Sequence, residues 1–97
     1  DIEGAEWHAI LGGEELIRRS KNLKILMEWW GELYGDADKR PQIDEGYAFL
    51  RSEGFELYAV RPPEGRNVYS TPPDIYAVNR FEDFLKLPHG DVLWVRS

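Results

Sequence analysis

The chain has 97 residues, of which 42% are hydrophobic, so it can bury one modest core and is too apolar for a disordered segment. Its 18 acidic and 12 basic residues give a net charge of −6, and Arg18-Arg19 and Lys39-Arg40 both lie near acidic residues. This balance argues against nucleic acid as a partner, because phosphate binding needs a basic surface. The absence of cysteine excludes disulfides and thiolate metal sites, and no apolar run approaches the ~20 residues that span a bilayer.

The first part of the chain is expected to be helical. Residues 4–20 carry apolar side chains at helical spacing, interrupted by Gly12-Gly13. Two glycines inside a helix cost roughly 2 kcal/mol relative to alanine, so we expect a break there. A second short helical segment is expected over residues 14–19.

The next segment, residues 23–29, is an apolar run in which only Lys24 and Glu28 are charged. Its length is that of a strand. Because apolar residues occupy both parities, it is predicted to be covered on both faces, as strands are inside a parallel sheet. Residues 30–40 contain several Gly and Asp residues and are expected to form a loop.

A second helix is predicted over residues 41–53. Proline is tolerated in a first helical turn, where Pro41 would stand, and Gly54 suits the position that follows a helix end. Three apolar residues recur at helical spacing within the segment. They are Ile43, Tyr47 and Leu50.

Strands and one long excursion are expected in the remainder. Residues 55–60 read as a strand, and residues 61–73 hold four of the six prolines, which favours a long excursion over a tight hairpin. Residues 75–78 are a candidate edge strand. A short helix over residues 81–85 is expected to have Asn79 as its N-cap.

The final strand is expected over residues 91–96. Strands that alternate with helices indicate an α/β layer architecture with right-handed crossovers. The last connection starts with the proline-rich excursion, so the final strand need not be parallel to its neighbours.

The densest carboxylate group is formed by Asp1, Glu3 and Glu6. Ligands of open α/β sheets lie beyond the carboxyl ends of strands, where a carboxylate can take a proton from a hydroxyl or bind a divalent cation. The alternative is that Glu3 and Glu6 are first-turn acids that favour the helix dipole.

A second candidate site lies at the C-terminal end of the predicted strand over residues 23–29. Glu28 with Trp29 and Trp30 could line a substrate pocket, and the alternative is a surface acid beside two tryptophans that cap the core. Of the two histidines, His8 is expected to be a surface or half-buried residue and His89 a turn residue. Neither belongs to a Ser-His-Asp arrangement or to metal-ligand spacing.

Several stretches resemble the second half of the FkbM-type S-adenosylmethionine-dependent methyltransferases. The most specific are Asp1-Ile2-Glu3-Gly4-Ala5-Glu6, Gly12-Gly13 near the end of the following helix, and Ile25-Leu26-Met27-Glu28-Trp29. Two later stretches stand where that family has its sixth and seventh strands. They are Glu53-Gly54-Phe55-Glu56-Leu57-Tyr58 and Asp91-Val92-Leu93-Trp94-Val95.

The resemblance implies a single partial domain over residues 1–97, the C-terminal part of a Rossmann-like methyltransferase fold. Its three main strands would be a parallel pair, 23–29 and 56–60, with 91–96 antiparallel between them. Asp1 would end the preceding strand. No glycine-rich cofactor loop matches, so S-adenosylmethionine would bind to the parent protein outside this fragment, which is not expected to be active alone.

The resemblance also implies functional roles. Asp1 and Glu3 would be catalytic, and the substrate-binding residues would be Glu28, Trp29 and Trp30. The parent would be a cytoplasmic O-methyltransferase acting on a small-molecule or glycan hydroxyl. No cofactor-binding or metal-binding residue is assigned in this chain.

The chain begins without methionine at a turn motif that usually follows a strand, so a piece of a larger protein is expected. The apolar edge of the strand over residues 23–29 would then be bare and would favour a homo-oligomer. An alternative function is a non-catalytic α/β module for assembly or partner binding. A carboxylate metal hydrolase is disfavoured, since no histidine accompanies the acids.

Overall fold

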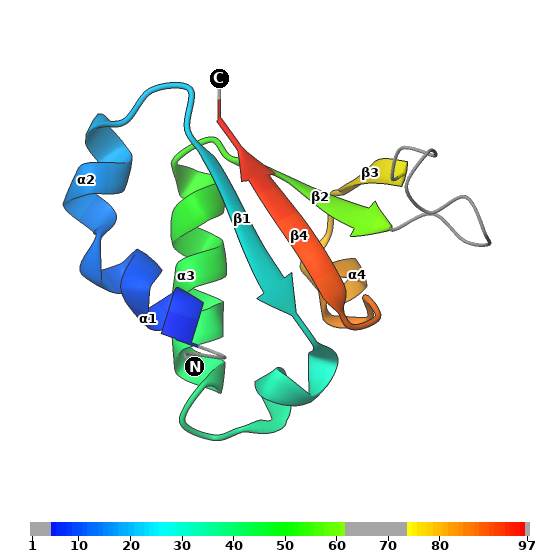
Figure 1. The fold of residues 1–97 in the computed structure, drawn as a ribbon. Helices are drawn as coiled ribbons and strands as arrows, with labels where there is room; N and C mark the ends of the chain where they lie inside the picture. Colours follow the sequence, from blue (N-terminus) through cyan, green and yellow to red (C-terminus); the bar gives the residue numbers. More distant parts are fainter. Residues whose placement is uncertain (1–4, 62–73, 97) are drawn as a thin grey trace.

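The computed structural model describes residues 5–61 and 74–96 (Figure 1). Its elements in chain order are α1 Ala5–Gly12, α2 Glu14–Arg19, β1 Lys24–Trp29, the 3₁₀ helix η1 Gly31–Gly35, α3 Arg40–Ser52, β2 Glu56–Arg61, β3 Asp74–Val78, α4 Phe81–Leu85 and β4 Gly90–Val95. The chain is thus a small mixed α/β domain. Figure 1 shows α3 and α4 behind the sheet, with α1 and α2 beside β1.

The four described strands lie in the order β1-β4-β2-β3, and every pairing between them is antiparallel. The predicted parallel sheet is therefore wrong. The last strand does lie between β1 and β2 and opposes both, and the segment over residues 75–78 does form an edge strand. Because β4 opposes both neighbours, β1 and β2 share a chain direction without being hydrogen-bonded to each other.

The prediction that β1 is covered on both faces is also wrong. Met27 and Trp29 are buried, whereas Lys24, Leu26 and Glu28 are exposed, and Leu26 keeps 65% of its surface accessible. This is the alternation of a strand with helices on one face only. The outward-facing position at the middle of β1 is a leucine. The sequence therefore does not show the alternation of buried and exposed residues.

The predicted helices are largely confirmed. The first helical region breaks at Gly13, and α3 lies within one residue of the predicted span with its three apolar residues buried. Gly54 follows α3 with φ +88°, and the bonds from Gly54 N–H to the Arg51 carbonyl and from Phe55 N–H to the Leu50 carbonyl form a Schellman motif.

Two local predictions near helix ends are wrong. Arg80, rather than Asn79, is the N-cap of α4, and no side-chain bond caps that helix. The expected loop over residues 30–40 contains η1, which begins after Trp30 and buries Leu33.

An aromatic cluster forms the centre of the core. Trp29 stacks on Phe84 with ring centroids 4.2 Å apart, and Trp7 meets the rings of Trp29 and Trp94 edge-on at 6.2 and 6.5 Å. All three tryptophans are at most 1% exposed. The cluster joins α1, α4 and the middle of the sheet, and it fixes which face of β1 and β4 points inward.

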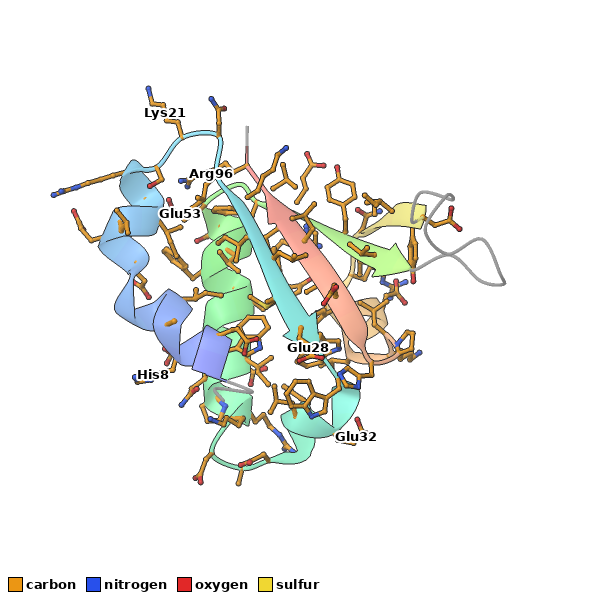
Figure 2. The ribbon with its side chains drawn as sticks, in the orientation of Figure 1. His8, Lys21, Glu28, Glu32, Glu53 and Arg96 are labelled. Atoms are coloured by element: carbon orange, nitrogen blue, oxygen red, sulfur yellow. The ribbon has the colours of Figure 1, made fainter. Side chains whose placement is uncertain are left out.

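Arg96 fastens the opposite end of the domain. Its guanidinium donates hydrogen bonds to the carbonyls of Ile17 and Ser20, and to the Glu53 side chain at 3.2 Å. It also lies 4.7 Å from the centroid of the Phe55 ring. Figure 2 shows Arg96 and Glu53 close together at that end of the sheet. One side chain therefore ties the C-terminal ends of α2 and α3 to the residue after β4.

Candidate functional site

The predicted catalytic residues Asp1 and Glu3 lie outside the described residues, so their roles stay predictions. Glu6, the third acid of that group, is half-buried in the first turn of α1. That position agrees with the alternative in which an acid near a helix N-terminus interacts with the helix dipole. His8 is exposed on α1, as expected for a surface histidine.

Glu28, Trp29 and Trp30 do not form one pocket. Trp29 has no exposed surface and points into the aromatic cluster, whereas Glu28 is exposed on the opposite face of β1. Successive side chains of a strand point to opposite faces, so these neighbours cannot face one ligand together. Trp29 belongs to the core, and the residues of this group with surface exposure are Glu28 and Trp30.

The structure brings His89 to this end of β1. The His89 Nε2 atom lies 2.9 Å from Glu28 Oε2, and the imidazole centroid lies 5.5 Å from that of the Trp30 ring. His89 was expected to be only a turn residue. The pairing of Trp29 with Gly90 in the β1–β4 ladder sets His89 beside Glu28 and Trp30. We call His89, Glu28 and Trp30 the imidazole cluster; Figure 2 labels Glu28 at the end of β1.

A second carboxylate lies next to the imidazole cluster. Asp91 of β4 is the direct cross-strand partner of Glu28, so both side chains point to the same outer face. Like charges in opposite positions of a ladder repel each other. A protonated His89 imidazole beside Glu28 would reduce that repulsion. Among the described residues no group of three or more His, Asp or Glu side chains could hold a metal ion.

A small cavity of about 60 Å³ adjoins the cluster. It is lined by Ala59, Val60, Tyr76, Leu87, Pro88, His89, Gly90, Asp91 and Val92. The cavity is far smaller than the ~300–1,000 Å³ of sites that enclose a drug-sized ligand. It suits a hydroxyl group or a few water molecules.

The cavity and the cluster lie at one end of the sheet. The register pairs Trp29, the last residue of β1, with Gly90, and pairs Val60, near the end of β2, with Asp91. The carboxyl ends of β1 and β2 therefore meet at this end of the sheet.

The cluster has a defined chemical capacity. When Glu28 accepts a hydrogen bond from the Nε2–H of His89, the neutral imidazole keeps Nδ1 as an acceptor. That atom can take a proton from a hydroxyl brought within hydrogen-bond distance. Both side chains are substantially exposed, so the site as described is open to water.

The described part of the chain holds no helix long and apolar enough to cross a membrane. Comparison of the chain with protein-family models, with curated proteins and with solved structures finds no match.

Proposed function

We propose that this chain is the acceptor side of an S-adenosylmethionine-dependent O-methyltransferase of the FkbM type, cytoplasmic and active only as part of its parent protein. The observation that carries the proposal is the strand order. Two strands that share one direction flank a final strand that opposes both, and this is the arrangement that the resemblance implies for the C-terminal part of such enzymes.

The uncovered face of the sheet supports the same proposal. Leu26 and Ile75 are 65% and 55% exposed on this outer face, and Tyr58, Val60 and Leu93 are half-buried there. A sheet of the Rossmann-like type is covered by helices on both faces. In the proposed parent, elements outside this chain would cover these apolar side chains.

Within the proposal, Asp1 and Glu3 are the catalytic carboxylates, and the acceptor is a small-molecule or glycan hydroxyl. Glu28 and Trp30 stay on the substrate side, and His89 joins them. The imidazole would accept the hydroxyl proton at Nδ1 while Glu28 holds the ring. Trp29 supports this end of β1 from inside the core.

The described residues do not fit the cofactor. β1 runs through Trp30 into η1, rather than into a glycine-rich loop that opens a helix. The 60 Å³ cavity is also too small for a nucleoside. In the parent, S-adenosylmethionine would be held by residues outside the described part, and we assign none of its chemistry to this chain.

The test is made on the full-length parent protein. Calorimetric titration with S-adenosylmethionine should show binding, and a hydroxyl acceptor should become methylated. Asp1→Ala should lower turnover far more than stability, while Glu15→Ala, which removes an exposed acid of α2, should leave turnover unchanged. A parent that neither binds the cofactor nor transfers methyl groups contradicts the proposal.

A second candidate is a non-catalytic α/β module for partner binding. An apolar groove of about 310 Å³ beside β1 favours it, because exposed apolar grooves mark interaction sites. A parent that binds a protein partner without binding S-adenosylmethionine would support this candidate over the enzyme.

A further inference from the structure

The outer edge of β1 has backbone groups that no described strand pairs with. Among the described strands β1 pairs only with β4, and the Arg96 N–H donates a 3.0 Å bond to the Leu23 carbonyl. Residues of an antiparallel strand alternate between bonding toward the partner and away from it. Starting from Leu23, the backbone N–H and C=O groups of Lys24, Leu26 and Glu28 therefore point away from β4.

An apolar groove of about 310 Å³ runs along this edge. It is lined by Glu6, Ala9, Ile10, Gly13, Leu16, Ile17, Leu23, Ile25, Leu26 and Met27. Figure 1 shows α1 and α2 on the side of β1 that faces away from β4. A strand added to β1 would therefore form backbone hydrogen bonds with β1. Its side chains on the inner face of the sheet would be buried against α1 and α2. Leu16, now 70% exposed, would be covered.

The edge also carries a charge pattern. On the outer face Leu26 lies between the cation of Lys24 and the anion of Glu28. Side chains directly opposite each other in a ladder interact. A strand antiparallel to β1 matches this edge when it carries, at alternate positions from its N-terminus, a cation, an apolar residue and an acid.

β1 itself carries this order of charges over residues 24–28, but a second complete copy of the chain does not suit the groove for a steric reason. Antiparallel pairing of β1 with another β1 keeps opposite side chains on the same face, so the helices of both copies would come to one side. That side of the added strand is already covered by α1 and α2. An extended strand without its own helix layer avoids this overlap.

We propose that the edge of β1 and its groove bind one extended strand of another polypeptide, antiparallel to β1, with the pattern Lys-x-Leu-x-Glu in which x is apolar. The antiparallel direction follows the other pairings of the sheet, and antiparallel pairing is slightly more stable per residue. The main-chain bonds would supply affinity and the alternate side chains specificity. The inference concerns the 97-residue chain and does not rest on the proposed enzyme function.

The test titrates the ¹⁵N-labelled chain with the capped peptide Thr-Lys-Val-Leu-Val-Glu-Thr, followed by NMR. Binding at about 1 mM peptide or below is expected, with the amide signals of Lys24, Leu26 and Glu28 and of the groove residues shifting together. The matched control is the same peptide with its Lys and Glu exchanged, which should bind at least about threefold more weakly.

Two variants test the edge itself. Leu26→Pro removes an outward N–H without removing a bond to β4, and it should abolish binding. Lys24→Glu should weaken binding of the original peptide about threefold. The same variant should bind normally a peptide in which Lys replaces the Glu. Ile75→Lys, at the opposite edge of the sheet, should change nothing.

Three results would overturn the inference. They are an absence of binding at about 1 mM peptide, shifts confined to β3, and equal or tighter binding of the exchanged peptide. Sedimentation provides the remaining check. If the unliganded chain forms a dimer that Leu26→Pro dissociates, the occupant is a second copy and the proposed strand partner is wrong.

Discussion

Adding one methyl group at Gly46 should destabilise the domain although it improves helix propensity. A Cβ atom built on Gly46 lies 2.5 Å from Cε3 and 3.0 Å from Cζ3 of Trp7, whereas carbon atoms pack best about 3.5–4.0 Å apart. The indole cannot retreat easily, because its ring centroid lies 6.0 to 6.5 Å from those of Trp29, Phe84 and Trp94. The substitution Gly46→Ala therefore overpacks the centre of the core.

The two opposing effects can be compared. Alanine in a helix interior gains about 1 kcal/mol over glycine, and overpacking a core costs about 1–3 kcal/mol. The contact is shorter than real Cβ contacts allow and involves a buried ring, so the upper half of that range applies. We expect a net loss of about 1–2 kcal/mol in the free energy of unfolding, or roughly 4–16 °C in Tm.

Urea denaturation followed by tryptophan fluorescence and circular dichroism measures this loss. The matched control is Gly12→Ala at the end of α1, where an added Cβ meets no atom within 4 Å, and which should stabilise by about 0.4–1 kcal/mol. In a Trp7→Phe background, the effect of Gly46→Ala should shrink, because the smaller ring leaves room. A Gly46→Ala protein as stable as the Gly12→Ala protein would refute the reasoning.

Three further predictions concern a helix end, the arginine that ties two helices to the sheet, and one tyrosine. Gly54→Ala should cost about 1–2 kcal/mol in urea denaturation, because φ +88° is unfavourable for a residue with a Cβ; an unchanged midpoint would contradict this. Arg96→Met should cost about 2–3 kcal/mol, since its bonds to Glu53 and to two helix-end carbonyls are lost; a loss below about 0.5 kcal/mol would show that these bonds matter little. The hydrogen bond that the Tyr34 hydroxyl donates to Asp44 raises the pKa of Tyr34 above 10.0, so its contribution to stability is complete below pH 10 and is lost as the pH rises through the higher folded value. Asp44→Asn should lower that pKa in an alkaline ultraviolet titration compared with a Tyr34→Phe reference, and an unchanged titration would count against the bond.

The ends of α3 could be predicted because their signals are local. Pro41 falls in the first turn, and Gly54 has the positive φ that a helix end needs. Both features depend on a few adjacent residues and on backbone sterics. The burial of Ile43 and Leu50 follows from helical spacing alone.

The sheet could not be predicted to the same extent, because strand pairing joins distant residues. The imidazole cluster depends on a bond between residues 61 positions apart, Glu28 and His89. A His89 in a Pro-His-Gly turn carries no local mark of that contact. Once β4 is known to pair with β1, the register places His89 beside Trp30, so the signal lies in the pairing.

The wrong prediction for β1 has the same origin and bears on function. Four of its six residues are apolar and occupy both parities, yet helices cover one face only, which leaves Leu26 outside. Exposed edge strands tend to aggregate unless charged side chains oppose pairing with other strands. On β1 these side chains are one cation, Lys24, and one anion, Glu28. Charges of a single sign would repel any strand that carries the same sign. A cation and an anion on the same edge instead favour a strand whose charges are opposite at the facing positions. This is why we expect selective binding at this edge.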